Sequence, residues 1–144
     1  MNKMVKFLYL GNAIGSKDLF EILSETAEVK GCYVPSMSQA FFRLETHEKI
    51  DTIVIADDFI QFNFEHPVNS LEDLVKAKNQ LDAFIEQKGC TKKKICFFID
   101  IEYYVETKNC NEEKFKEFCK ENGIELFDIT ITKNEERLIE FISR

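Results

Sequence analysis

The sequence SQAFFRLETHEKIDTIVIADD, at residues 38–58, is the stretch that decides the fold. Its first half has the apolar spacing of an amphipathic helix, and Thr52–Ala56 is a continuous apolar run rich in β-branched residues. Such a run is typical of a strand in a parallel sheet that helices cover on both faces. Two adjacent carboxylates, Asp57 and Asp58, come directly after this strand, where parallel α/β sheets bind their ligands.

Four further runs have strand character. They are Val5–Leu10, a weaker run at 29–34, Lys94–Ile99 and 125–130. Helical patterns fill the segments between them and follow the last strand. Several side chains are candidate N-caps for these helices: Ser16, Ser36 or Ser38, Ser70 and Asn111. Strand and helix thus alternate five times, which predicts a three-layer α/β fold of flavodoxin or receiver type, with five parallel strands in the order 2-1-3-4-5.

Length and composition predict one globular domain over residues 1–144. Hydrophobic residues make up 44% of the chain and charged residues 31%, and only 2 Pro and 5 Gly leave little room for linkers. The formal charge of −7 opposes nucleic-acid binding, which requires basic groups to neutralise phosphates. The single basic run, at 92–94, is interpreted as a solvated loop and strand edge. The apolar runs are too short to span a bilayer, so no membrane association is expected.

The five cysteines predict a reducing environment. Their number is odd, none forms a C-x-x-C pair, and Cys96 and Cys119 fall at apolar strand and helix positions, as small core residues do. A cytoplasmic protein without disulfides is the corresponding expectation. Because the chain has only 2 His and its potential ligands are scattered, we expect neither a metal site nor a cofactor.

The pattern of elements resembles the receiver domains of response regulators. Ile50-Asp51 precedes the central strand, as an Ile-Asp or Pro-Asp pair does in receivers. Thr132-Lys133-Asn134 is similar to the segment that carries the receiver's strand-five lysine. The resemblance spans nearly the whole chain and implies a signalling domain that binds partners through its last strands and helices.

The residues that a receiver uses for phosphorylation are mostly replaced. Receivers bind Mg²⁺ with two acids after strand one and a phosphoacceptor Asp after strand three. Here Gly11-Asn12 follows strand one, the phosphoacceptor position falls on Ala56 or Asp57, and Asp100 stands where a hydroxyl is expected. The resemblance therefore implies an atypical pseudo-receiver. Its candidate phosphoacceptor or acidic pocket comprises Asp57, Asp58, Asp100 and Lys133.

A second resemblance is to small Ras-like GTPases. The sequence GNAIGSK after the first strand looks like an eroded P-loop, whose amides cradle phosphates in intact form. The glycine spacing is one residue short, Asp18 occupies the hydroxyl position, and no Asn-Lys-x-Asp motif follows strand four. The candidate eroded phosphate loop comprises Gly11, Gly15, Ser16 and Lys17.

These observations predict a non-catalytic regulatory domain that acts in the cytoplasm through protein–protein interaction, with a partner protein or as a homodimer. Phe59, Tyr103 and Tyr104 are expected in loops near the strand ends as aromatic anchors of the interface. Three alternatives stay open: a nucleotide-binding, GTPase-like protein, a Mg-dependent phosphorylatable receiver, and a small enzyme. In the enzyme, Asp57, Asp58 and Asp100 would hold a divalent metal.

Overall fold

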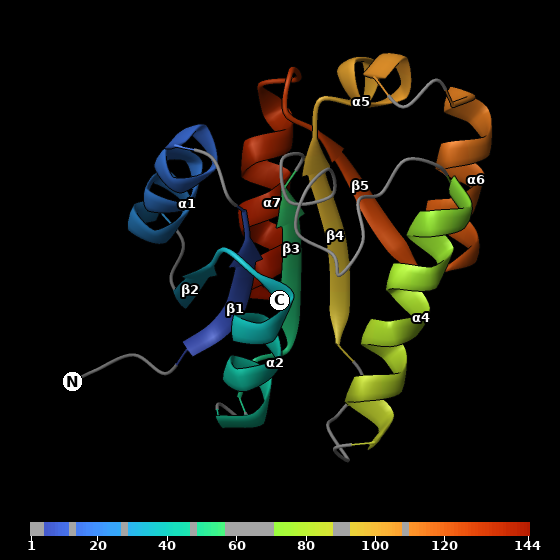
Figure 1. The fold of residues 1–144 in the computed structure, drawn as a ribbon. Helices are drawn as coiled ribbons and strands as arrows, with labels where there is room; N and C mark the ends of the chain where they lie inside the picture. Colours follow the sequence, from blue (N-terminus) through green and yellow to red (C-terminus); the bar gives the residue numbers. More distant parts are fainter. Residues whose placement is uncertain are drawn as a thin grey trace.

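The computed structural model describes residues 5–11, 14–26, 29–46, 49–56, 71–87, 93–107 and 110–144. Within these ranges, five strands form one all-parallel sheet in the order β2-β1-β3-β4-β5 (Figure 1). The strands are β1 (Val5–Leu10), β2 (Lys30–Val34), β3 (Thr52–Ala56), β4 (Lys94–Ile99) and β5 (Ile124–Asp128). The predicted α/β class and the predicted strand order are both confirmed.

Helices cover both faces of the sheet. They are α1 (Ile14–Thr26), α2 (Met37–Thr46), α4 (Leu71–Gln87), α5 (Ile101–Thr107), α6 (Glu112–Glu121) and α7 (Lys133–Ser143). One core contains buried side chains of α2, α4 and α6, and the other contains those of α1 and α7. Every residue of β3 is buried, because this central strand lies between the two cores and between β1 and β4. The continuous apolar run in its sequence follows from that position.

Helix α5 replaces the loop that was predicted after β4. Asp100 is its N-cap: the Tyr103 N–H donates to Asp100 Oδ1 at 3.1 Å, and the Tyr104 N–H donates to the Asp100 carbonyl at 2.9 Å. The prediction that both tyrosines lie in a loop is wrong. A short helix with β-branched and aromatic residues has weak intrinsic helix propensity, so its capping contact and packing decide its formation.

The predicted N-caps fare differently. Ser36 Oγ accepts a first-turn N–H of α2 at 3.3 Å, so Ser36 rather than Ser38 is the cap. Asn111 Oδ1 accepts a first-turn N–H of α6 at 3.1 Å, which confirms that prediction. Ser16 lies inside the first turn of α1, so its prediction as the cap is wrong. Ser70 lies outside the described residues.

Two lysines of the basic run are structural rather than solvated. Lys93 is only 8% exposed, and its Nζ donates to the main-chain oxygen of Ile50. Lys94 Nζ donates to the main-chain oxygens of Phe141 at 2.6 Å and Arg144 at 3.1 Å, at the carboxyl end of α7. A cation there interacts favourably with the helix dipole, while burial lowers the pKa of Lys94. The interpretation of this run as a solvated loop and strand edge is therefore wrong for Lys93, which is buried, whereas Lys94 is half-buried at the start of β4.

Candidate functional site

Strand β5 is the edge strand of the described sheet, next to β4. The Ile129 N–H, just beyond β5, donates to the Ile99 carbonyl of β4 at 2.9 Å. Because main-chain groups alternate in direction along a strand, those of Phe127 also point toward β4, and those of Ile124 and Leu126 point away from it. In the described part of the chain, β4 is the only strand that pairs with β5. The outward N–H and C=O groups of Ile124 and Leu126 thus form a short template for strand pairing.

The carboxyl end of this edge is closed by the chain itself. Asn134 is buried, and its Nδ2 donates to the Asp128 carbonyl at 3.1 Å. The Ile131 N–H donates to the same carbonyl at 3.2 Å. Asp128 Oδ1 accepts the N–H and the hydroxyl of Thr130 at 2.9 and 2.6 Å, which holds the turn after β5. The open part of the edge therefore ends at Asp128.

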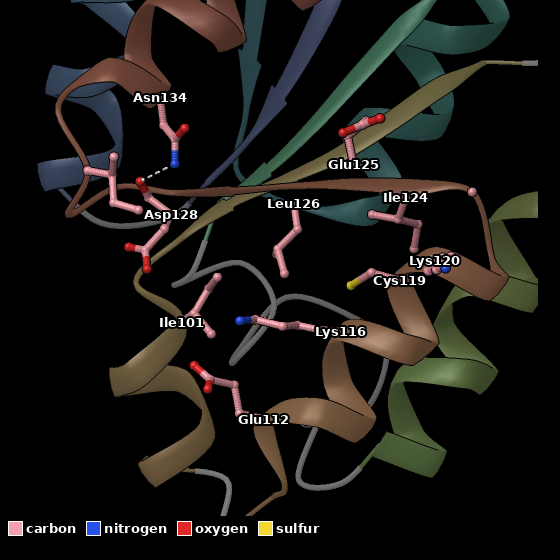
Figure 2. A pocket seen from close by; sticks show the side chains of 12 residues that line it. Ile101, Glu112, Lys116, Cys119, Lys120, Ile124, Glu125, Leu126, Asp128 and Asn134 are labelled. Carbon is pink, nitrogen blue, oxygen red and sulfur yellow. Dashed lines mark hydrogen bonds between the residues drawn. The ribbon is translucent and has the colours of Figure 1, made fainter.

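A groove of about 620 Å³ runs beside this edge, between β5 and α6 (Figure 2). Its apolar floor is formed by Ile101, Cys119, Ile124 and Leu126. The charged residues that line it are Glu112, Lys116, Lys120, Glu125 and Asp128. Figure 2 shows Glu112 near the Asp128 end of the groove and Lys120 near the Ile124 end, because α6 runs opposite to β5. On the α6 side the groove thus carries two carboxylates near the Asp128 end and two lysines toward the Ile124 end, while Glu125 points to the other side of the strand (Figure 2).

The opposite face of β5 carries a smaller hollow of about 330 Å³. Glu125 and Phe127 of β5 line it, together with Arg137, Glu140 and Arg144 from α7 and the chain end. Figure 2 shows Leu126 on the α6 side of the strand and Glu125 on the other side. The edge of β5 is therefore flanked by a depression on each face, which leaves room for another strand beside it.

The candidate acidic pocket is only partly described. Asp100 directly follows β4 and Asp128 is the last residue of the neighbouring strand β5, where the register pairs it with Ile99. One caps α5 and the other holds the turn after β5, so both carboxylates have structural partners. Lys133 opens α7 and is exposed, rather than standing at the end of β5 as a receiver lysine does. Asp57 and Asp58 lie outside the described residues.

The candidate phosphate loop begins as a tightly packed turn. Gly11 is buried, and its N–H donates to the Val34 carbonyl at 3.1 Å. A Cβ at this position would lie 2.7 Å from Ser16 Cβ, so only glycine allows the first turn of α1 to pack so closely. Gly15 and Lys17 are exposed. Ser16 is buried against Gly11. Packing of the first turn of α1 thus explains why these two residue types occur at positions 11 and 16.

The two predicted interface tyrosines have opposite environments. Tyr103 is 53% exposed on α5, whereas Tyr104 is 2% exposed, with its ring centroid 4.9 Å from that of Phe115. The prediction of Tyr104 as an interface anchor is therefore wrong, because it belongs to the core. Phe59 lies outside the described residues. Sequence reasoning missed Ile129 and Ile131, which are exposed after β5 and alternate with threonines in ITIT.

The cysteines in the described ranges are free. Cys96 and Cys119 are buried, as predicted for small core residues. Burial raises the pKa of the Cys119 thiol to about 12 and raises the pKa of the Cys96 thiol further. Both thiols are therefore protonated at neutral pH.

Comparison of the sequence with protein-family models and with curated proteins finds no match. Among the described residues, no group of three or more His, Cys, Asp or Glu side chains is placed to hold a metal ion. None of the helices in the described ranges is both long and apolar enough to cross a bilayer.

Proposed function

We propose that this chain is a non-catalytic regulatory domain that acts through protein–protein interaction, with the edge of β5 as its binding face. The observation that carries the proposal is the open edge itself. The outward main-chain groups of Ile124 and Leu126 lie beside a groove of about 620 Å³ with an apolar floor. Open strand edges are templates for pairing with another chain, and folded proteins usually cover or blunt them.

The surface beyond the carboxyl end of β5 supports the same assignment. Ile129 and Ile131 are exposed there, and Tyr103 is exposed on the helix that follows the neighbouring strand β4. Exposed apolar side chains are found at many interaction sites, and Tyr is a common anchor residue. We define the binding face as the β5 edge, its groove and these three side chains.

The two described carboxylates at the strand ends also fit a binding module. Asp100 fixes the start of α5, which carries Tyr103, and Asp128 fixes the turn that carries Ile129 and Ile131. Their hydrogen bonds therefore give the binding face a defined shape. Rigid presentation of anchor residues reduces the entropy lost on association.

Site-specific photo-crosslinking tests this face. A photoreactive residue replaces the exposed Lys116 in the groove, and the matched control replaces the exposed Lys30 on β2, the other edge strand. We expect a partner to crosslink from position 116 in native extracts and not from position 30. The identified partner is then purified, and its affinity for the unmodified chain is measured directly.

The affinity measurement decides between a specific face and general stickiness. Tyr103→Ala should weaken binding at least about tenfold if Tyr103 is an anchor. Phe42→Ala is the matched control, because Phe42 is 58% exposed on α2, away from this face. Equal crosslinking from both edges, or equal losses in the two variants, would refute the assignment of the face.

A further inference from the structure

We propose that the groove beside β5 receives an extended segment of a partner protein, which adds antiparallel to β5 as a sixth strand. The segment carries a basic residue at its amino end, alternating apolar residues in the middle and an acidic residue at its carboxyl end. This proposal rests on the binding face proposed above, and it gives that face a ligand of defined chemistry.

The main-chain geometry of the edge selects an extended segment. The outward groups belong to alternate residues, Ile124 and Leu126, and this spacing of about 7 Å is that of a strand. A helix uses its own main-chain groups internally and cannot pair with them. Antiparallel addition is favoured because parallel pairing is slightly less stable per residue.

The charges of the groove set the order of residues in the segment. Glu112 and Asp128 lie at the carboxyl end of β5, and Lys116 and Lys120 follow along α6 toward its amino end, where the Glu125 side chain points to the opposite side of the strand. The amino end of an antiparallel segment lies beside Asp128, so a basic residue fits there and an acidic residue fits at the other end. Apolar residues between them cover Leu126, Ile124 and Cys119.

A second copy of the chain fits the same edge less well. Antiparallel pairing of β5 with itself about Leu126 would set Asp128 of one copy opposite Ile124 of the other. Each copy carries a formal charge of −7, so long-range repulsion opposes the pairing as well.

The test uses two peptides of identical composition, KTVTVTE and ETVTVTK, each acetylated, amidated and labelled with a fluorophore. Fluorescence anisotropy at low ionic strength measures their binding to the whole chain, because screening weakens the contribution of the rim charges. We expect KTVTVTE to bind at least about tenfold more tightly than ETVTVTK. Lys116→Glu with Lys120→Glu should narrow or reverse this preference. Lys114→Glu, on the same helix but outside the groove, should leave it unchanged.

The main-chain contribution is tested in the protein and in the peptide. Leu126→Pro removes the outward N–H without removing a hydrogen bond to β4, and proline is tolerated on edge strands. This variant should lose binding, whereas Leu126→Ala should keep part of it. N-methylation of the first valine of KTVTVTE removes a peptide N–H that faces β5, and it should abolish binding to the unaltered chain. This measurement does not depend on whether the Leu126→Pro variant folds. N-methylation of the central threonine alters an N–H that faces away and should be tolerated.

The outcomes separate the ligand from the face. Equal affinities of the two peptides, or equal effects of the two methylations, would overturn the sixth-strand proposal. The unaltered chain could also prove to be a dimer. If Leu126→Pro dissociates that dimer and KTVTVTE does not compete with it, the edge binds a second copy of the chain instead. Crosslinking from position 116 without binding of either peptide would leave the face in place and reject this ligand. Absence of crosslinking from position 116 would reject the face itself.

Discussion

The Cys119 thiol should make this protein lose stability at alkaline pH. Cys119 lies on the sheet-facing side of α6 with 2% of its surface exposed, and burial raises its thiol pKa from 9.0 to about 12. In the unfolded chain this thiol ionises near its ordinary pKa, whereas in the folded protein it stays protonated. The stability contributed by the buried neutral thiol is therefore fully present below pH 9 and is lost as the pH rises toward 12.

The size of the loss in the free energy of unfolding follows from the shift of the Cys119 thiol pKa. Between the two pKa values, each pH unit lowers the free energy of unfolding by about 1.4 kcal/mol per thiol. At about pH 10, Cys119 alone should thus cost about 1.4 kcal/mol relative to neutral pH. Cys96 is fully buried in β4, and burial raises its thiol pKa as well. Ionisation of Cys96 therefore also lowers the free energy of unfolding at alkaline pH.

Urea denaturation at about pH 7.5 and about pH 10, with a reductant present, measures the effect. Cys119→Ala should lower stability at neutral pH by about 1 kcal/mol through lost packing. It should also reduce the alkaline loss by about 1.4 kcal/mol, because one titrating thiol is gone. Ile124→Val removes one methyl group from the same groove floor and no titratable group. It should lower the free energy of unfolding by about 0.5–1.5 kcal/mol at both pH values. If Cys119→Ala loses as much stability on alkalinisation as the unaltered protein, the linkage argument is wrong.

Four further predictions concern one helix cap and the candidate phosphate sites. Asn111→Ala should lower the free energy of unfolding by about 1 kcal/mol in urea denaturation, while Asn111→Asp should retain most of it. Gly11→Ala should cost about 1–3 kcal/mol through the clash with Ser16 Cβ, and adding Ser16→Gly should restore part of that loss in a double-mutant cycle. Incubation with Mg²⁺ and acetyl phosphate should produce no stable phosphoryl adduct by mass spectrometry, and ATP or GTP should show no micromolar binding in calorimetry. An adduct lost in Asp57→Asn would contradict the first expectation, and nucleotide binding lost in Lys17→Ala would contradict the second.

The sheet could be predicted from the sequence because its signals are local. The apolar run at Thr52–Ala56 marks a strand covered on both faces, and the alternation of strands with helices implies right-handed parallel crossovers. The strand order then makes β5 an edge strand, so its exposed side was already implicit in the prediction. Which of its residues point outward depends on the register with β4, which the sequence alone does not specify.

The missed features depend on contacts between distant segments. Lys93 can be buried because its ammonium group donates a hydrogen bond to the main-chain oxygen of Ile50, 43 residues away. Tyr104 is buried because α6 brings Phe115 against it. Asp100 is different, because the amide that its side chain caps belongs to Tyr103, only three residues further on. The burial of Lys93 and Tyr104 has no local signal in the sequence, whereas an Asp at the start of a helix is a local capping signal.

The turn beyond Asp128 also bears on the solubility of the protein. Open strand edges promote uncontrolled growth of a sheet from one molecule to the next. Here the edge strand is 5 residues long, and Gly123, with a φ of 65°, turns the chain immediately before it. Asn134 caps the far end through the Asp128 carbonyl. The unpaired part of the edge is therefore short, and a short edge strand is one of the means by which folded proteins limit edge-to-edge association.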